Sequence, residues 1–212
     1  DGIFDGTMYN SGQNCSATTR IYVQRKIYDD VLEALKVKAG KAVVGPGLDN
    51  NTEYGPLVSE KQLNTVLGYI EKGKEEGARL LVGGSRKGDK GYFVEPTIFA
   101  DVKDDMTIAR EEIFGPVMSV FVFDEVEEVI KRANDSEYGL AASVWTESIR
   151  KGHHIASKLQ AGTVWVNDFG LELETMPFGG YKKSGIGREM GGEYGISNYV
   201  EVKSVFVNHK VD

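Results

Sequence analysis

Residues 117–146, VMSVFVFDEVEEVIKRANDSEYGLAASVWT, contain the alternation on which the fold depends. The apolar run 117–123 predicts a buried strand, because β-branched and aromatic side chains favour strands. Segment 124–134 then has apolar residues at helical spacing, with Asp124 as its expected N-cap. A second short apolar run occupies 141–146. A strand, a helix and a strand joined by short links predict an α/β sheet whose strands are mostly parallel.

Strand-like runs continue on both sides of this stretch and are rich in β-branched and aromatic residues. They lie at 17–24, 78–84, 92–102, 162–167 and 199–207. In the last run, charged or aromatic residues alternate with valine over YVEVK, which is typical of a strand with one polar face. Because it follows the final glycine-rich loop, we expect it to be an edge strand that pairs with another chain.

Helical spacing separates most of these runs. It is found at 26–39, at 59–77 and at 146–161. Ser59 and Gln62 are placed to form a capping box at the start of the second helix, and Thr146 is the expected cap of the third. The predicted fold class is therefore α/β, with a doubly wound, mostly parallel sheet.

The composition is that of an ordinary globular protein, since 41% of the 212 residues are apolar and 27% are charged. A net charge of -7 with mixed signs argues against nucleic acid or an anionic membrane as a partner. No apolar run approaches the roughly 20 residues of a membrane span. A single cysteine excludes an intrachain disulfide, and we expect a cytoplasmic location. The sequence opens without a methionine, which indicates either that a leading segment was removed or that this is a piece of a longer protein.

The only cysteine, Cys15, lies in the stretch NSGQNC (10–15). A cysteine that serves packing is usually surrounded by aliphatic side chains. Cys15 instead follows Asn10, Gln13 and Asn14, and we expect their amides to surround the thiol and favour its charged, reactive form. Taken alone, the stretch also allows a half-buried structural cysteine at the start of a strand, because a single cysteine is a weak signal.

Two further clusters suit chemistry. In EEIFGPV (111–117), Glu112 is suited to accept hydrogen bonds from a ribose diol and Phe114 offers a flat apolar face. A solvated acidic turn is the alternative for this cluster. The loop 167–189 is acidic and then rich in glycine, and loops of this length are uncommon unless functional. The adjacent histidines at 153–154 point in different directions on a helix, so no metal site is expected.

NSGQNC, EEIFGPV and PFGGYKKSGIGRE, followed by the terminal run YVEVKSV, occur in an order and spacing that resembles the aldehyde dehydrogenase superfamily over essentially the whole chain. The resemblance implies an α/β catalytic domain over 1–195, and an oligomerisation strand and tail over 196–212. It also implies the oxidation of a small-molecule aldehyde with NAD or NADP. A homo-oligomer joined through the C-terminal strand is implied as well.

By this resemblance Cys15 is the nucleophile, which forms a thiohemiacetal and then a thioester. The backbone N–H of Cys15 matches one donor of the oxyanion hole. Glu112 matches the acid that holds the nicotinamide ribose, and Phe114 matches the aromatic beside the cofactor. Glu189 matches a second acid assigned to a proton relay.

The resemblance also implies where the substrate binds. The loop 168–178 matches the wall of the aldehyde tunnel, with Phe169 and Phe178 as apolar contacts. Glu172 and Glu174 in this loop would give the tunnel an acidic mouth, which suits a cationic aldehyde such as an aminoaldehyde or betaine aldehyde. Loop acids that merely interact with water are the alternative.

Three parts of the family's machinery match nothing in this sequence. They are the general base that hydrolyses the thioester, an asparagine that is the second oxyanion donor, and the dinucleotide-binding domain with the residues that select NAD or NADP. We therefore expect this catalytic portion not to turn over alone. Two other functions stay open: a thiol esterase or acyl-transfer domain that needs no cofactor, and a non-catalytic module that joins full-length subunits through its last strand.

Overall fold

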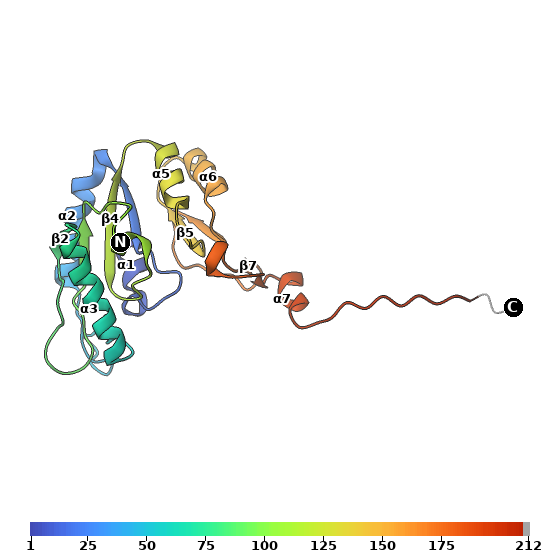
Figure 1. Cartoon of the computed structure of the whole chain (residues 1–212), viewed down its shortest axis with the longest axis horizontal. Helices are drawn as coiled ribbons and strands as arrows, with labels where there is room; N and C mark the ends of the chain where they lie inside the picture. Colours follow the sequence, from blue (N-terminus) through green and yellow to red (C-terminus); the bar gives the residue numbers. More distant parts are fainter. Residues whose placement is uncertain (210–212) are drawn as a thin grey trace.

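A four-stranded sheet with β4 at its centre forms the main body of the protein (Figure 1). The computed structural model describes residues 1–209. Strand β4 (Val117–Phe123) pairs in parallel with β1 (Arg20–Gln24) on one side and with β3 (Thr97–Ala100) on the other. Strand β2 (Arg79–Val82) completes the sheet as an antiparallel edge beside β3. The prediction of an α/β fold on a mostly parallel sheet is confirmed.

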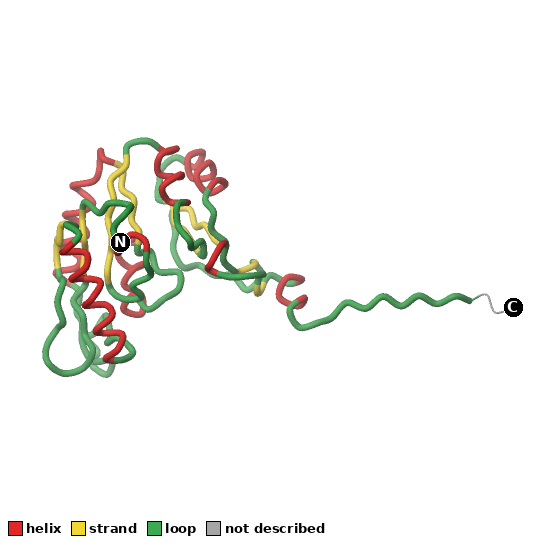
Figure 2. Tube along the Cα trace, viewed as in Figure 1, coloured by secondary structure: helices red, strands yellow, loops and turns green. Residues whose placement is uncertain are grey.

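Helices cover both faces of this sheet (Figure 2). Side chains alternate along β4, so Val117 and Phe121 belong to the core under α3 (Glu60–Glu75) and α4 (Thr107–Arg110). Met118 and Val120 belong to the core under α1 (Gly2–Met8) and α2 (Tyr28–Lys41). The alternation within one strand therefore produces three layers, as a doubly wound sheet requires.

A smaller unit follows in the second half of the chain. Strands β5 (Ala141–Val144) and β6 (Thr163–Val166) pair in parallel as a separate two-stranded sheet, beside α5 (Val126–Asn134) and α6 (Ile149–Lys158). Short elements complete the chain: the single turns η2 (Arg25–Ile27) and η3 (Lys182–Ser184), the antiparallel pair β7 (Pro177–Phe178) and β8 (Glu189–Met190), and α7 (Glu193–Ser197).

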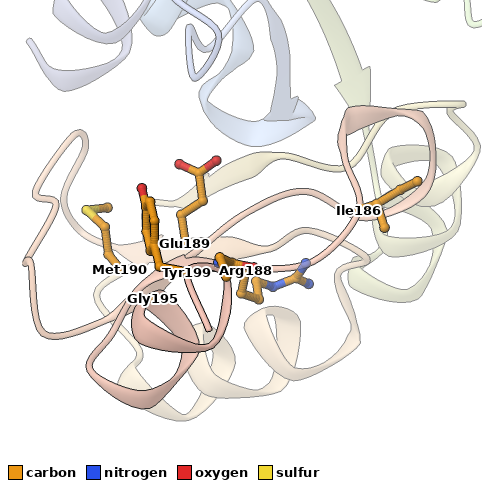
Figure 3. Close-up of a pocket in the computed structure, with 7 residues that line it drawn as sticks. Ile186, Arg188, Glu189, Met190, Gly195 and Tyr199 are labelled. Atoms are coloured by element: carbon orange, nitrogen blue, oxygen red, sulfur yellow. The ribbon is translucent and has the colours of Figure 1, made fainter. Parts of the chain in front are cut away.

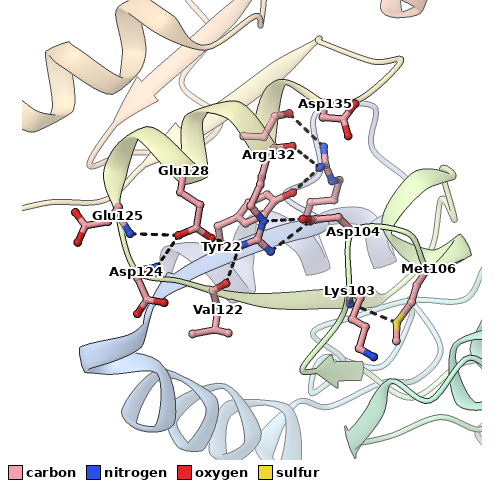
Figure 4. A network of polar contacts seen from close by, with 12 residues as sticks. Tyr22, Lys103, Asp104, Met106, Val122, Asp124, Glu125, Glu128, Arg132 and Asp135 are labelled. Atoms are coloured by element: carbon pink, nitrogen blue, oxygen red, sulfur yellow. Dashed lines mark hydrogen bonds and ion pairs between the residues drawn. The ribbon is translucent and has the colours of Figure 1, made fainter.

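A polar network holds α5 against the sheet (Figure 4). The Arg132 guanidinium donates to Asp104 at 2.7 Å, to Glu128 at 2.8 Å and to the Val122 carbonyl at 2.8 Å. The same guanidinium lies 5.2 Å from the centre of the Tyr22 ring, which in turn stacks on Phe121 at 4.7 Å. Burial raises the pKa of Tyr22 above 10.0, so its hydroxyl stays protonated. The Arg132 side chain thus links α5 to β4 and β1 through hydrogen bonds and a contact with the Tyr22 ring.

Two of the predicted helix caps are wrong. Helix α5 is capped by Glu125, which forms a capping box with Glu128, and not by Asp124. The Asp124 carboxylate instead pairs with Arg25 at 2.7 Å, a partner 99 residues away in sequence. Helix α6 is capped by Ser148, whose hydroxyl accepts from Lys151 N, and not by Thr146. The N-caps of α5 and α6 therefore lie one and two residues after the predicted positions, because tertiary partners and local turns engage the predicted caps.

Helix α1 was not predicted at all. Phe4 and Met8 are each 1% exposed and lie one turn apart, so this short helix is held by the core rather than by its own propensity. Within residues 1–209, no helix is long and apolar enough to cross a membrane.

The run 199–207 forms no strand within residues 1–209 and leaves the body as an extended arm (Figure 1). Its apolar side chains face solvent, with Val202 at 97% and Phe206 at 96% exposure. A strand exists only when hydrogen-bonded to a neighbour, and the described part of the chain supplies none here. The extended arm begins after α7, which spans the expected 195/196 boundary, and the last three residues of the expected tail, 210–212, lie outside the described residues.

Candidate active site

The thiol-bearing segment begins with a turn of unusual handedness. Helix α1 runs into the turn η1 (Tyr9–Gly12), in which Asn10, Ser11 and Gly12 have φ values of 50°, 57° and 75°. Left-handed backbone costs energy for residues that carry a Cβ, so contacts elsewhere must hold this turn. Cys15 follows three residues later, just ahead of β1.

The Cys15 thiol is exposed. Its Sγ lies 3.8 Å from Asn14 Oδ1 and 3.9 Å from Ser16 Oγ. Asn14 Oδ1 also accepts from the Ser16 backbone N–H at 3.2 Å, which fixes the amide with its oxygen toward the thiol. Within residues 1–209 no hydrogen bond engages the Cys15 backbone N–H, which leaves that donor available. A thiol in this setting does not serve packing.

The expectation that the amides of Asn10 and Gln13 surround the thiol is wrong. Asn10 Nδ2 donates to the Gln13 carbonyl at 3.0 Å and so closes the turn. The Gln13 amide points to residues 56–58, where its oxygen accepts from Val58 N at 2.8 Å. Both amides therefore satisfy backbone groups, one within the turn and one in the distant segment 56–58.

The second cluster of the site is the loop 111–116, which one face of α3 holds. Gln62 Nε2 donates to the carbonyls of Ile113 and Phe114 at 3.1 and 2.9 Å. The Tyr69 hydroxyl donates to Glu111 at 2.7 Å, and this bond raises the pKa of Tyr69 to about 12. Phe114 has φ 56°, a further left-handed residue that these bonds support.

The expected capping box at Ser59 is therefore only half formed. Ser59 Oγ accepts from Gln62 N at 3.2 Å, which confirms the N-cap. The Gln62 side chain, however, turns to the carbonyls of the 111–116 loop instead of returning to the cap. Sequence reasoning missed Gln62 and Tyr69 as site residues, although their spacing of seven places them on one face of α3.

The thiol turn and the 111–116 loop touch. A Cβ added to Gly12 would lie 2.1 Å from the Gly115 carbonyl oxygen, so only glycine allows this approach. A cavity of about 660 Å³ beside this contact is lined by Cys15, Glu112 and Phe114 together. Three residues that the sequence singled out separately thus share one space.

The same cavity separates two strand edges. Its walls include all of β1 and all of β5, which belong to different sheets. Arg20 Nε on β1 and Ser143 Oγ on β5 are buried without a hydrogen-bond partner in the described part of the chain. The Glu112 carboxylate is exposed and makes no hydrogen bond or ion pair with another of residues 1–209. The space therefore offers unused hydrogen-bonding groups on several sides.

The remaining predicted site residues lie elsewhere. Glu189 in β8 lines a separate cavity of about 280 Å³ with Arg188 and Tyr199 (Figure 3). Phe178 in β7 is paired in register with Glu189. Phe169 packs on the Trp165 ring with 5.5 Å between ring centres.

The acidic loop residues and one of the adjacent histidines lie on the surface. Glu172 and Glu174 are exposed in the loop before β7 and, like Phe169, do not line the Cys15 cavity. His154 Nε2 lies 2.6 Å from the Glu127 carboxylate on the surface of α6. Residues 1–209 contain no cluster of three His, Cys, Asp or Glu that could hold a metal ion.

The amino-acid sequence is similar to a known protein family and to proteins of known name. The model of the aldehyde dehydrogenase family matches residues 1–205. Human mitochondrial aldehyde dehydrogenase is 53% identical over 199 residues, which are 94% of this chain and 38% of that protein. Betaine aldehyde dehydrogenase of Brucella anthropi is 50% identical over 216 residues, covering 100% of this chain and 44% of that protein.

Solved structures agree. The NAD+ complex of an aldehyde dehydrogenase from Bacillus cereus is 60% identical and superposes with a TM-score of 0.96, over 99% of this chain and 42% of that one. An aldehyde dehydrogenase from Mycobacterium tuberculosis, also with NAD+, gives a TM-score of 0.94 at 45% identity, over 100% of this chain and 44% of that one. The chain thus spans about four-tenths of the length of the relatives it matches.

Proposed function

Because the chain belongs to the aldehyde dehydrogenase family, we propose that it is the catalytic portion of an NAD(P)-dependent enzyme that oxidises an aldehyde to a carboxylic acid. The observation that carries this proposal is the single cavity lined by the Cys15 thiol, Glu112 and Phe114. A nucleophile, a hydrogen-bond acceptor for a diol and a flat apolar face are the groups that such a reaction needs around one space.

The residues present fit the nicotinamide half of the cofactor. Glu112 has an exposed carboxylate without a protein partner in residues 1–209, which suits the two hydroxyls of a ribose. Phe114 is 37% exposed and held at the cavity by Gln62, which suits contact with an aromatic ring. The adenosine half and the choice between NAD and NADP belong to residues outside this chain.

The chemistry at Cys15 follows from its surroundings. The thiolate attacks the aldehyde carbon, and the carbonyl oxygen takes the negative charge of the thiohemiacetal. The Cys15 backbone N–H, which makes no hydrogen bond within residues 1–209, is the donor proposed to stabilise this charge. A bound NAD(P) supplies the acceptor for the hydride that leaves the same carbon, and a thioester on Cys15 remains. Glu189, in its separate cavity, is proposed for proton relay rather than for contact with the thiol.

The chain is proposed to need a further segment for turnover. Within residues 1–209 the Cys15 thiol has only Asn14 and Ser16 as polar side-chain neighbours, and neither is a general base, so the base that activates water for thioester hydrolysis is proposed to lie in that further segment. The unpaired edges of β1 and β5 face each other across the cavity, with Arg20 Nε and Ser143 Oγ unsatisfied. Two such edges are pairing surfaces for an additional strand, so a segment outside these residues is expected to complete the sheet and the site.

The nucleophile is tested by acylation with p-nitrophenyl acetate. The chain should release a burst of p-nitrophenol, because an exposed thiol forms the acyl-enzyme without cofactor. Cys15→Ala should abolish the burst, and a burst that survives this change would remove Cys15 from the mechanism. Continued turnover of the ester by the chain alone, without need of a further segment, would favour the cofactor-independent esterase.

The ribose contact is tested in a longer protein that contains this chain and a cofactor-binding segment. Glu112→Gln should raise KM for NAD by about tenfold, since a hydrogen bond to a charged group is replaced by a neutral one. Glu33→Gln is the matched control, because this carboxylate on α2 is also exposed and does not line the Cys15 cavity. Equal effects of the two changes would contradict the assignment of Glu112.

A cationic aldehyde is proposed as substrate from the two exposed loop acids, Glu172 and Glu174, with support from the similarity to a betaine aldehyde dehydrogenase. Changing both acids to Gln should raise KM for an aminoaldehyde and spare a neutral aliphatic aldehyde. The difference should shrink with added salt, because exposed charges are screened over about 10 Å at about 0.1 M ionic strength. Equal effects on both aldehydes would mean that the acids serve solubility only.

A further inference from the structure

The left-handed turn before Cys15 is tied to a distant segment. Ser11 Oγ donates to the Gly55 carbonyl at 2.8 Å, and Ser11 is only 5% exposed. Gln13 Oε1 accepts from the Val58 N–H at 2.8 Å, and Gln13 Nε2 lies 3.4 Å from the Pro56 carbonyl. Two side chains of the turn thus hydrogen-bond with the backbone of residues 55–58.

These contacts act where the backbone is least stable by itself. Asn10 and Ser11 both carry a Cβ and both have φ near +50° to +60°. Residues in this region persist only when the surrounding structure holds them. The Asn10–Gln13 bond closes the turn internally, but it leaves the direction of the turn free. The bonds to residues 55–58 tie the turn to a segment that lies more than 40 residues away in sequence.

The 55–58 segment continues directly into the helix that holds the other loop of the site. Val58 is followed by Ser59, the N-cap of α3. Gln62, one turn into this helix, donates to the carbonyls of Ile113 and Phe114. Residues 55–62 therefore contact the thiol turn at one end and the Phe114 loop at the other.

We propose that Ser11 and Gln13 are positioning residues, which set the Cys15 thiol at a fixed place relative to the Phe114 loop by anchoring the thiol turn to residues 55–58. The proposal rests on the proposed function, in which Cys15 is the nucleophile and Phe114 lies beside the cofactor. The contact of Gly12 with Gly115 keeps the two loops apart at a fixed spacing, and the 55–62 segment prevents them from separating.

The test compares Ser11→Ala and Gln13→Ala with Ser119→Ala in the full chain. Ser119 is a matched control, because it is 2% exposed and its hydroxyl donates to a backbone carbonyl, that of Ile108, at 3.1 Å. Amide hydrogen exchange of residues 10–17 should become at least about tenfold faster in the two turn variants, since the turn opens locally. Ser119→Ala should leave exchange in 10–17 unchanged.

A second measurement separates positioning from general structural support. Acylation of Cys15 by p-nitrophenyl acetate places an oxyanion at the Cys15 N–H, whereas alkylation by iodoacetamide needs only the thiolate. We expect acylation to fall by about tenfold or more in both turn variants, and alkylation to stay within about threefold. Because Cys15 is the only thiol, both reactions report this residue alone.

The two measurements together test the proposed positioning role of Ser11 and Gln13. Unchanged exchange in both turn variants would overturn the proposal, and so would faster exchange with an unchanged ratio of acylation to alkylation. If the unmodified chain is not acylated, the assignment of Cys15 as nucleophile fails. The hydrogen exchange then still shows whether Ser11 and Gln13 hold the turn.

Discussion

Replacing Gly12 with alanine disrupts the contact between the thiol turn and the 111–116 loop. The new Cβ would lie 2.1 Å from the Gly115 oxygen and 2.2 Å from its carbonyl carbon, both of them backbone atoms that cannot rotate away. To restore a separation of 3.0 Å, the loops must move apart by about 0.9 Å. Left-handed backbone at φ 75° costs a residue with a Cβ about 1–2 kcal/mol, and overpacking adds about 1–3 kcal/mol. We expect Gly12→Ala to lower the free energy of unfolding by about 2–5 kcal/mol.

The catalytic loss should exceed what this destabilisation explains. A displacement of about 1 Å between reacting groups costs on the order of a hundredfold in rate. The assays are urea unfolding and Cys15 acylation, measured where both proteins are folded. Gly68→Ala, in the middle of α3 with no atom within 4 Å of the added Cβ, is the control and should stabilise by about 0.5–1 kcal/mol. A Gly12→Ala protein with unchanged stability and acylation would refute the reasoning.

Three further results are expected. The Glu111 hydrogen bond raises the pKa of Tyr69 to about 12, so in a spectrophotometric titration Glu111→Gln should bring Tyr69 back toward 10.0. The Arg79 guanidinium, 2.6 Å from Asp101, lowers the pKa of that carboxyl below 3.8, so the pair stabilises the fold above about pH 4 and is lost as pH falls through the lowered pKa. Asp101→Asn should therefore reduce the loss of unfolding free energy between about pH 6 and about pH 3, by no more than about 1 kcal/mol because the pair is half exposed. Removal of the apolar arm 199–209 should convert an oligomer to a monomer in sedimentation, and a protein that is monomeric with the arm intact would remove its proposed role.

The sequence by itself determined the fold class and three residues of the site. The pattern of β4 requires burial on both faces, because a continuous apolar strand is unstable with either face in water. Six of the seven expected strands form within or at their predicted ranges. Cys15 was singled out by its polar surroundings, and Glu112 and Phe114 by the chemistry of the EEIFGPV loop and by the family resemblance; the three line one cavity.

Only the tertiary structure decided which groups hold these residues in place. Gln62 lies at the position of a capping residue in the sequence, yet its side-chain amide donates to carbonyls 51 and 52 residues away. Gln13 follows the same principle, since its partner Val58 is 45 residues distant. Side-chain amides bond whichever backbone group the fold leaves unpaired nearby, and that group is known only after the chain has packed. Local patterns therefore predicted six of the strands, the longer helices and the candidate reactive side chains, while long-range contacts determined α1 and how those side chains are held.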